Sequence, residues 1–406
     1  MFKKKTPKFY IIIAAAALLA AFCAWYFRPV TLNVALYSYV PDKARFEAAV
    51  RSAWAEEHPG VGLNFVEWNC YVADLPEDLD VFVFDCAFLS DYIDDGLLLP
   101  LSENEIADAG DIFPFCLAAC RKDDSLYAVP QLLCEHMLFT RKGDAELAGV
   151  NSIPELDAVL GDYGMEAAAT TGSSGALETA ESKADMEGLL ANYGDSFSYL
   201  CLYYGAMIEA AQEYRDHFPL PEEGLDSKGA IETLQKLQQM AGPLWREELH
   251  AEIGTYPLAA RFAAGEGRAL ISYSECMSEL GDDAAAQYDI RPVFMTDQEK
   301  LKVLFMDAAG VRSGIRGRKR QLAVDLLNVL TGTDVLAQAA RPFQEGESCQ
   351  YLLLARNSAY EALKNDYPAY GILQPMISDP DNRIFLLKPS GKKYVEQEEL
   401  ALKQLP

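Results

Sequence analysis

Residues 127–140 read Tyr127-Ala-Val-Pro-Gln-Leu-Leu-Cys-Glu-His-Met-Leu-Phe-Thr140, a long apolar stretch with an internal proline. Proline removes a backbone donor and breaks a helix, so the stretch is predicted to be extended. We expect it to cross between two lobes, the second of which begins near Arg141. Residues 152–155 then predict a capped helix, and residues 164–184, rich in Gly, Ser, Thr and Ala, predict a mobile loop.

The chain before this crossover alternates short apolar strands with helices. Residues 34–36 predict a strand, and the spacing of Phe46, Val50 and Trp54 predicts the buried face of the helix that follows. Residues 81–84 are apolar on both faces, as is typical of a buried strand in a parallel sheet. This pattern predicts an α/β lobe.

Two later strands carry acidic residues. Residues 262–275 predict a helix end, a glycine turn and a strand, with Tyr273 and Glu275 at the strand exit, where they should face a cleft. Residues 301–310 predict another apolar strand, and this strand contains Asp307.

The first 29 residues differ from the rest of the chain. Four lysines precede an unbroken apolar run at residues 9–27, and Arg28 and Pro29 end the run. This pattern predicts a signal peptide or an N-terminal membrane anchor that places the remaining chain outside the cytoplasm. Phe22 before Cys23 argues against a lipoprotein signal, which requires a small residue at that point.

The chain is strongly acidic, with 61 Asp and Glu residues against 35 Lys and Arg residues and a net charge of -26. Such a surface repels phosphate groups, so we expect no nucleic-acid partner. A small cationic ligand would be attracted, although acidity is also a common means of keeping a protein soluble. The charge leaves both interpretations open.

Nine cysteines occur without paired spacing or a CxxC motif, so no disulfide framework is predicted. Cys116 and Cys120 are four residues apart on an apolar helical stretch, which favours buried thiols over half of a metal site. The sequence also lacks a phosphate-loop lysine, a zinc-binding HExxH motif and a GxSxG elbow. A serine or zinc hydrolase is therefore disfavoured, and we expect no metal and no cofactor.

Asp85 follows the buried strand at residues 81–84. Ligands bind beyond the carboxyl ends of the strands in open α/β sheets, so Asp85 is a candidate for the site. Alternatively, it is the N-cap of a helix at residues 87–92, because Asp is a favoured capping residue. The sequence leaves both roles open.

Considered alone, Cys134 would be a structural thiol, because apolar surroundings raise the pKa of a thiol and make it unreactive. On the crossover, however, it faces the cleft, where a carboxylate of raised pKa can take its proton once substrate shields both groups. Glu275 is the candidate base. His136 is an alternative partner for Cys134, although a hydrogen-bonded polar residue near the cleft wall is the favoured interpretation.

Residues 127–144, the strand end Tyr273-Ser274-Glu275 and the tail segment 350–356 resemble bacterial thiaminase I, also called thiamine pyridinylase. The likeness covers nearly all of residues 30–389 and is weakest at residues 161–191. The family has the type II fold of periplasmic solute-binding proteins of the maltose-binding kind. This implies two α/β lobes, each a mixed sheet flanked by helices, with the active site in the cleft between them.

The resemblance also implies that each lobe is assembled from two stretches of the chain. Residues 30–137 and 295–340 are expected to form the first lobe, and residues 138–294 and 341–406 the second. Residues 1–29 precede them as the signal peptide or anchor. We expect a monomer.

The reaction that the resemblance implies is a transferase reaction at the methylene bridge of thiamine. A cysteine thiolate adds to the pyrimidine ring, the thiazole leaves, and a small nucleophile such as pyridine or aniline takes its place. Cys134 matches the family nucleophile and Glu275 the base that activates it.

Other matching residues would bind the substrate. Asp85 and Asp307 can hydrogen-bond the aminopyrimidine nitrogens as the ring gains electron density. Tyrosines line the family's site, and an aromatic face beside the cationic thiazolium contributes about 0.5–2 kcal/mol. The matching positions are Tyr37, Tyr71, Tyr256 and Tyr273.

A rival hypothesis is an extracytoplasmic binding protein that captures thiamine or a related cation and performs no chemistry, since fold alone does not determine function. A pure binder has no need for a nucleophile and a base, and both residues are present here. A carbohydrate-binding protein on the same fold is poorly supported, because it would require a richer set of tryptophans in the cleft.

Overall fold

The computed structural model describes residues 30–170, 188–191, 196–210, 228–241, 255–297 and 302–387, together with residue 395. The side chains of residues 162–170, 196–199, 210, 255 and 256 lie outside this description. Within the described part, no helix is long and apolar enough to cross a membrane. The leader at residues 1–29 falls outside it, as do residues 171–184 of the predicted mobile loop.

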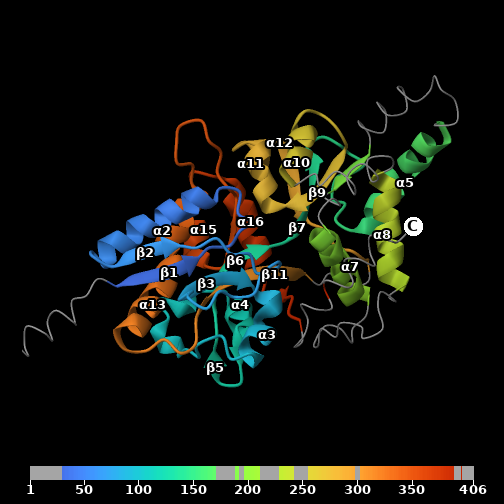
Figure 1. The fold of residues 1–406 in the computed structure, drawn as a ribbon. Coiled ribbons are helices and arrows are strands. Elements are labelled where there is room, and N and C mark those ends of the chain that lie inside the picture. Colours follow the sequence, from blue (N-terminus) through green and yellow to red (C-terminus); the bar gives the residue numbers. More distant parts are fainter. Residues whose placement is uncertain are drawn as a thin grey trace, which may run out of the picture.

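The larger sheet of the described chain has seven strands and mixes parallel with antiparallel pairs (Figure 1). Its strands are β1 (Thr31–Ala35), β2 (Gly62–Phe65), β3 (Val81–Asp85), β6 (Val129–Cys134), β11 (Val303–Val311), β12 (Leu353–Leu354) and β13 (Arg383–Ile384). Strand β1 runs parallel to β2 and β3, whereas β11 is antiparallel to β3 and β6. Every residue of β3 is buried, which confirms the prediction for residues 81–84.

Helices cover the larger sheet. They are α2 (Lys43–Glu57), α3 (Leu89–Asp94), α4 (Pro114–Ala119), α13 (Gly317–Leu330), α14 (Thr333–Ala340), α15 (Asn357–Leu363) and α16 (Ala369–Ile377). The predicted inner face of α2 is confirmed, because Phe46, Val50 and Trp54 are buried. Asp42 caps this helix by accepting a hydrogen bond from the backbone N–H of Arg45, which satisfies one of the free donors of the first turn.

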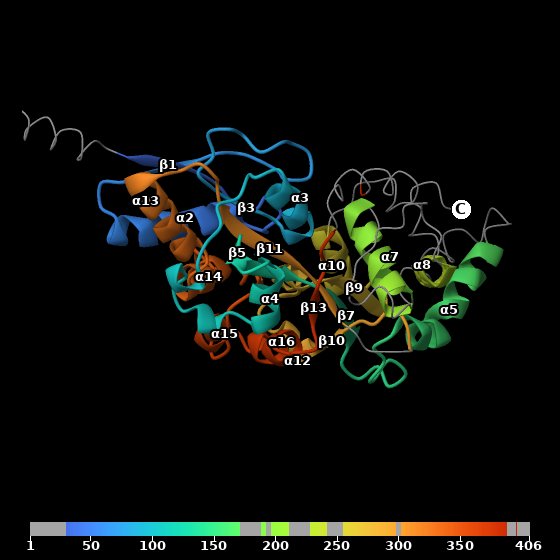
Figure 2. The same ribbon diagram turned by 90° about the horizontal axis from the view of Figure 1, so that it is seen from below.

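The smaller sheet has the strand order β10-β7-β9-β8 among the described residues. These strands are β7 (His136–Arg141), β8 (Leu189–Ala191), β9 (Ala269–Tyr273) and β10 (Tyr288–Pro292). The helices of this part are α5 (Ile153–Thr170), α7 (Ser196–Ala210), α8 (Lys228–Ala241), α10 (Thr255–Ala263), α11 (Met277–Leu280) and α12 (Ala284–Gln287). In Figure 2, α5, α7 and α8 lie at the opposite end of the molecule from α2 and α13.

The predicted crossover is confirmed, because residues 127–140 leave one sheet and enter the other. Strand β6 ends at Cys134 in the larger sheet, and β7 begins at His136 in the smaller sheet. Glu135 is the one residue between them. Strand β10 belongs to the smaller sheet and β11 to the larger sheet, so the chain passes between the sheets a second time.

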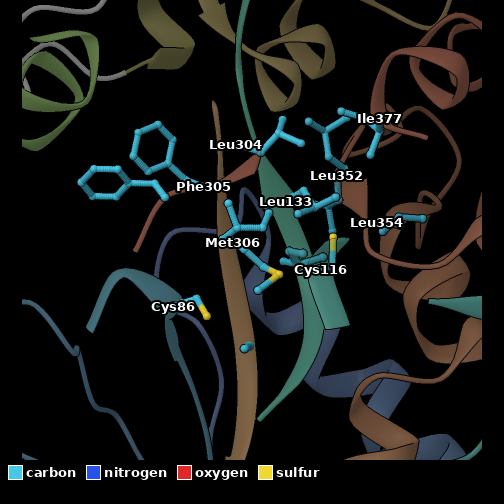
Figure 3. Close-up of a cluster of buried hydrophobic side chains, with 14 of the residues drawn as sticks. Cys86, Cys116, Leu133, Leu304, Phe305, Met306, Leu352, Leu354 and Ile377 are labelled. Atoms are coloured by element: carbon cyan, nitrogen blue, oxygen red, sulfur yellow. The ribbon is translucent and has the colours of Figure 1, made fainter. Parts of the chain in front are cut away.

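Apolar side chains fix β6 and β11 at this junction. Figure 3 shows side chains of both strands packed against the C-terminal segment that contains β12 and α16. The residues labelled there are buried: Cys86, Cys116, Leu133, Leu304, Phe305, Met306, Leu352, Leu354 and Ile377. Close packing of this kind restricts movement of the strands, so the side chains at their ends are held in place.

Two features differ from the sequence-based expectations. Residues 164–170 belong to helix α5 and not to a loop, because the helix that begins at Ile153 continues to Thr170. Strand β12 bonds to β6 and β13 bonds to β11, so both lie in the larger sheet, whereas residues 341–406 were expected in the second lobe. The division of the chain into lobes otherwise stays a prediction.

Candidate active site

Cys134 is the last residue of β6 and the point where the strand leaves the larger sheet. The five residues before it are buried, whereas Cys134 itself is partly exposed. The other described cysteines are all buried, Cys116 and Cys120 among them, as expected for structural thiols. Cys134 is therefore the described thiol that a ligand can reach.

Burial raises the pKa of the Cys134 thiol well above its ordinary value, and the negative charges of Glu275 and Asp307 raise it further. In the free protein the thiol is therefore protonated. A thiolate forms only if a base takes the proton at the moment when a ligand shields the site.

Glu275 lies where a strand of the smaller sheet ends. Strand β9 pairs with β7 so that Tyr273 lies opposite His136, two residues beyond Cys134. The turn Ser274–Cys276 follows at once and carries Glu275, whose Oε2 accepts a hydrogen bond from the Ser274 hydroxyl at 3.1 Å. Burial raises the pKa of Glu275 to about 7, which is the range of an effective general base at neutral pH.

Asp85 and Asp307 face each other across two neighbouring strands. Their Cα atoms are direct partners in the antiparallel register of β3 and β11, and both side chains are buried. Burial raises the pKa of Asp85 to about 6. The pKa of Asp307 is raised well above its ordinary value by burial, then by the charges of Asp85 and Glu275. Two buried carboxylates this close do not both ionise, so Asp307 holds the proton and Asp85 the charge.

Hydrogen bonds connect two tyrosines to these acids. The Tyr71 hydroxyl donates to Oδ2 of Asp85, and the hydroxyls of Tyr37 and Tyr71 lie 2.9 Å apart. Tyr37 is also hydrogen-bonded to Asp307. The hydrogen bond to Tyr37 lowers the pKa of Asp307, but burial and the charges of Asp85 and Glu275 outweigh it.

The predicted capping role of Asp85 is confirmed, and its role in the site stays a prediction. Its Oδ1 accepts a hydrogen bond of 2.8 Å from the backbone N–H of Ala87, which caps the short helical turn Cys86–Phe88. The other oxygen is bound to Tyr71 in the site. The capping bond fixes the carboxylate without using its whole capacity, because a carboxylate accepts several hydrogen bonds.

Tyr39, which the sequence favoured less than the four expected tyrosines, belongs to the same cluster. Its ring packs edge-on against Tyr37 and Tyr71, with centroid distances of 5.8 and 5.6 Å, and it is 57% exposed. An exposed aromatic face beside two acids is suited to a cationic ligand. Trp68, by contrast, is buried against Phe82 and Tyr92 in the core.

The two remaining tyrosines, Tyr273 and Tyr256, have less clearly defined positions relative to the site. Tyr273 is half-buried and its ring lies against His136, with a centroid distance of 4.4 Å. Tyr256 belongs to helix α10, but its side chain lies outside the described residues, so its role stays a prediction.

The Cys134–His136 pair is not supported. The pKa of His136 is lowered to about 3 by burial alone, with no contribution from the thiol. Its Nε2 has no hydrogen-bond partner within the described part of the chain, so the favoured interpretation of a hydrogen-bonded residue also fails for this atom. β6 ends and β7 begins between the two residues, which interrupts the strand alternation, and His136 lines a cavity that Cys134 does not line.

Known proteins match both the sequence and the fold. The model of the Thiaminase-1 domain family matches residues 135–293. Thiaminase-1 of Paenibacillus thiaminolyticus is 37% identical over 367 residues, which cover 90% of this chain and 86% of that protein.

Solved structures extend this likeness. The structure of Clostridium botulinum thiaminase I in complex with thiamin superposes with a TM-score of 0.81 at 34% identity and covers 92% of this chain and 100% of that one. Thiaminase I from Bacillus thiaminolyticus gives 0.79 at 36% identity, with coverage of 92% and 99%. Maltose-bound MalE3 of T. maritima gives 0.63 at 15% identity, covering 91% and 92%, which confirms the expected two-lobed binding-protein fold.

Proposed function

Because the chain belongs to the thiaminase I family and is a thiamine-degrading enzyme, we propose that Cys134 is its nucleophile and Glu275 its general base. The observation that carries this proposal is the placement of a partly exposed thiol and a half-buried carboxylate at strand ends beside the crossover, where the charge of Glu275 raises the pKa of Cys134. A non-catalytic binding protein is not favoured, since binding needs neither group.

In the proposed reaction, Glu275 accepts the Cys134 proton and the thiolate adds to the pyrimidine ring of thiamine. The ring gains electron density, which a protonated Asp307 stabilises by donating a hydrogen bond to a ring nitrogen, while ionised Asp85 accepts one from the exocyclic amine. The thiazole leaves from the methylene carbon and carries away the electron pair of that bond. A small nucleophile such as pyridine or aniline then adds to the methylene carbon, and the thiolate leaves the ring.

The charge of the substrate favours this sequence. Thiazolium is a cation, and a cation close to buried carboxyl groups offsets the desolvation that raises the pKa values of Asp85 and Glu275. Tyr37, Tyr71 and Tyr39 provide aromatic faces for the same charge. Substrate binding therefore favours the ionised base that the reaction needs.

The direct test is to incubate the chain from Val30 onward with thiamine and either pyridine or aniline. Mass spectrometry should detect the pyrimidine joined to the added base, together with free thiazole. Failure to form either product, at concentrations at which thiamine binds, would show that the protein is a binder and not a transferase.

Location outside the cytoplasm is part of the same proposal. Residues 1–29 have the composition of a signal peptide or membrane anchor, with the apolar run at residues 9–27 as the hydrophobic segment. Thiamine outside the cell is then the accessible substrate.

The pH profile of kcat/KM is expected to rise through about pH 7. Glu275 must be ionised to accept a proton, and its pKa of about 7 means that the active carboxylate is present above this pH and lost below it. Asp85, with a pKa of about 6, adds a second ionisation in the same direction. Initial rates in a series of buffers measure the profile, and a flat profile across this range would exclude Glu275 as the base.

Tyr71→Phe is expected to raise the KM for thiamine about tenfold or more, because a hydrogen bond to a charged group contributes about 1.5–3 kcal/mol. The Tyr71 hydroxyl lowers the pKa of Asp85, so its loss raises that pKa and reduces the anionic form that would accept from the substrate amine. Tyr39→Phe is the matched control, since the Tyr39 hydroxyl, in the described structure, accepts a hydrogen bond only from the half-buried Asn69 side chain. Equal KM values for the two variants would contradict the assigned role of Tyr71.

A further inference from the structure

A small polar cavity of about 30 Å³ lies beside the crossover, apart from the groups assigned to chemistry. Glu135 and His136 line it from the crossover, and Val303 and Phe305 line it from the start of β11. Glu209 of α7 also contributes a wall. The cavity therefore adjoins the crossover and the start of β11, while the proposed nucleophile and base do not line it.

Two buried polar atoms at this cavity lack a protein partner among the described residues. Oε2 of Glu135 and Nε2 of His136 make no hydrogen bond, although the two side chains are only 5% and 8% exposed. Buried polar groups of this kind are strongly destabilising unless they are hydrogen-bonded. We therefore expect a molecule that can form hydrogen bonds with both atoms to lie between them.

The other charged groups at the cavity already have partners. Oε2 of Glu209 accepts from the backbone N–H of Thr296 at 2.9 Å, and Lys302 donates to the carbonyl oxygen of Met376 at 2.8 Å. No group of three His, Cys, Asp or Glu side chains suited to a metal ion occurs in the part of the chain that the structure describes. Lys302 also faces Glu135, because its charge lowers the pKa of that carboxyl group. The atoms that still lack a hydrogen bond among the described residues are Oε2 of Glu135 and Nε2 of His136.

We propose that this cavity is a water-binding site, and that the bound water joins Glu135 to His136 and so makes Glu135 a positioning residue for the reaction. The volume exceeds the roughly 10–15 Å³ that one water occupies. A water donates to Nε2 of His136 and, with its second proton or a lone pair, bonds Glu135 in either protonation state.

The water between Glu135 and His136 affects the positions of both the nucleophile and the base. This role rests on the proposed function. Glu135 is joined to Cys134 by a peptide bond. His136 is the register partner of Tyr273 and packs against its ring, and Tyr273 lies two residues before Glu275. Holding Glu135 and His136 together therefore holds the nucleophile and the base at a constant separation.

The test compares Glu135→Leu with Glu135→Gln in the full chain, with Glu279→Leu as the exposed control on helix α11. Glu135→Leu removes the bond to the water and is expected to lower kcat about tenfold to a hundredfold while KM changes little, because small displacements of reacting groups are costly. Glu135→Gln can still bond the water and should retain most of the wild-type kcat. The Glu279→Leu control should match the wild type.

A crystal structure of the wild-type protein provides the second measurement and does not depend on turnover. It should show an ordered water within hydrogen-bond distance of Oε2 of Glu135 and Nε2 of His136. A dry cavity, a cation in its place, or a folded Glu135→Leu variant with unchanged kcat would overturn the proposal. If the wild type does not cleave thiamine, the proposed function fails, and the crystal structure still decides whether the water site exists.

Discussion

Cys134→Ser is expected to lose at least about 10⁴-fold of kcat for thiamine cleavage, as when the nucleophile of another covalent enzyme is replaced. The serine hydroxyl is a much weaker acid than the cysteine thiol, and its oxygen is a harder nucleophile. A carboxylate with a pKa of about 7 cannot deprotonate it to a useful extent. Thiamine binding should persist, because Asp85, Asp307 and the tyrosines are unchanged. Product formation measures the first effect, and isothermal titration calorimetry measures the second.

A matched control separates loss of the nucleophile from loss of a thiol. Cys349 is fully buried and its Sγ lies 3.9 Å from the Tyr370 hydroxyl, away from the site. Cys349→Ser should leave kcat close to that of the wild type, whatever it does to thermal stability. Retention of turnover by Cys134→Ser would contradict the proposed mechanism.

Glu275→Gln is expected to lower kcat/KM by about 10²–10⁴-fold, the usual contribution of a general base. The amide keeps the shape of the side chain but cannot accept the Cys134 proton. The rising limb that Glu275 contributes to the pH profile should disappear as well. Single-turnover measurements isolate the chemical step and show whether it has become rate-limiting.

The same variant should be more stable than the wild type at high pH, which shows that its inactivity is not caused by unfolding. The pKa of Glu275 is about 7 in the folded protein and has an ordinary value of 4.5. Between these values the folded state binds the extra proton, so the contribution of this group to stability is full below 4.5 and falls as the pH rises through 7.

At about pH 8 the wild type therefore carries a destabilising buried charge that the variant lacks. Denaturant unfolding at about pH 8 and about pH 4 should show an advantage for Glu275→Gln that shrinks at the lower pH. Glu279→Gln is the control, since that side chain is exposed. An equal loss of stability at both pH values would mean that Glu275 has a structural role instead.

Local signals predicted much of the fold. The proline-containing run before Thr140, the stripe of Phe46, Val50 and Trp54, and the apolar residues 81–84 each set a local conformation that packing then preserved. Sequence patterns were weak where the strands are short. Strand β12 has two residues, too few for any periodicity, so only its hydrogen bonds to β6 reveal that it lies in the larger sheet.

The sequence pattern also could not predict whether Cys134 and His136 lie on the same face of the crossover. Alternation within a single strand would place Cys134 and His136 on one face. In the structure, a change of sheet occurs at Glu135, and His136 turns to a separate cavity. Such a break depends on which strands each half pairs with, and that information lies in distant parts of the chain.

Side-chain chemistry and periodicity along a few residues were enough to predict the residue types of the proposed site, the strands that carry them and the crossover. The protonation of the two buried acids, by contrast, depends on long-range packing. Antiparallel pairing of β3 with β11 brings Asp307 opposite Asp85, and Tyr37 and Tyr71 link the two. The pKa of a buried group depends on the charges and donors that folding places around it, and these come from segments separated by more than two hundred residues.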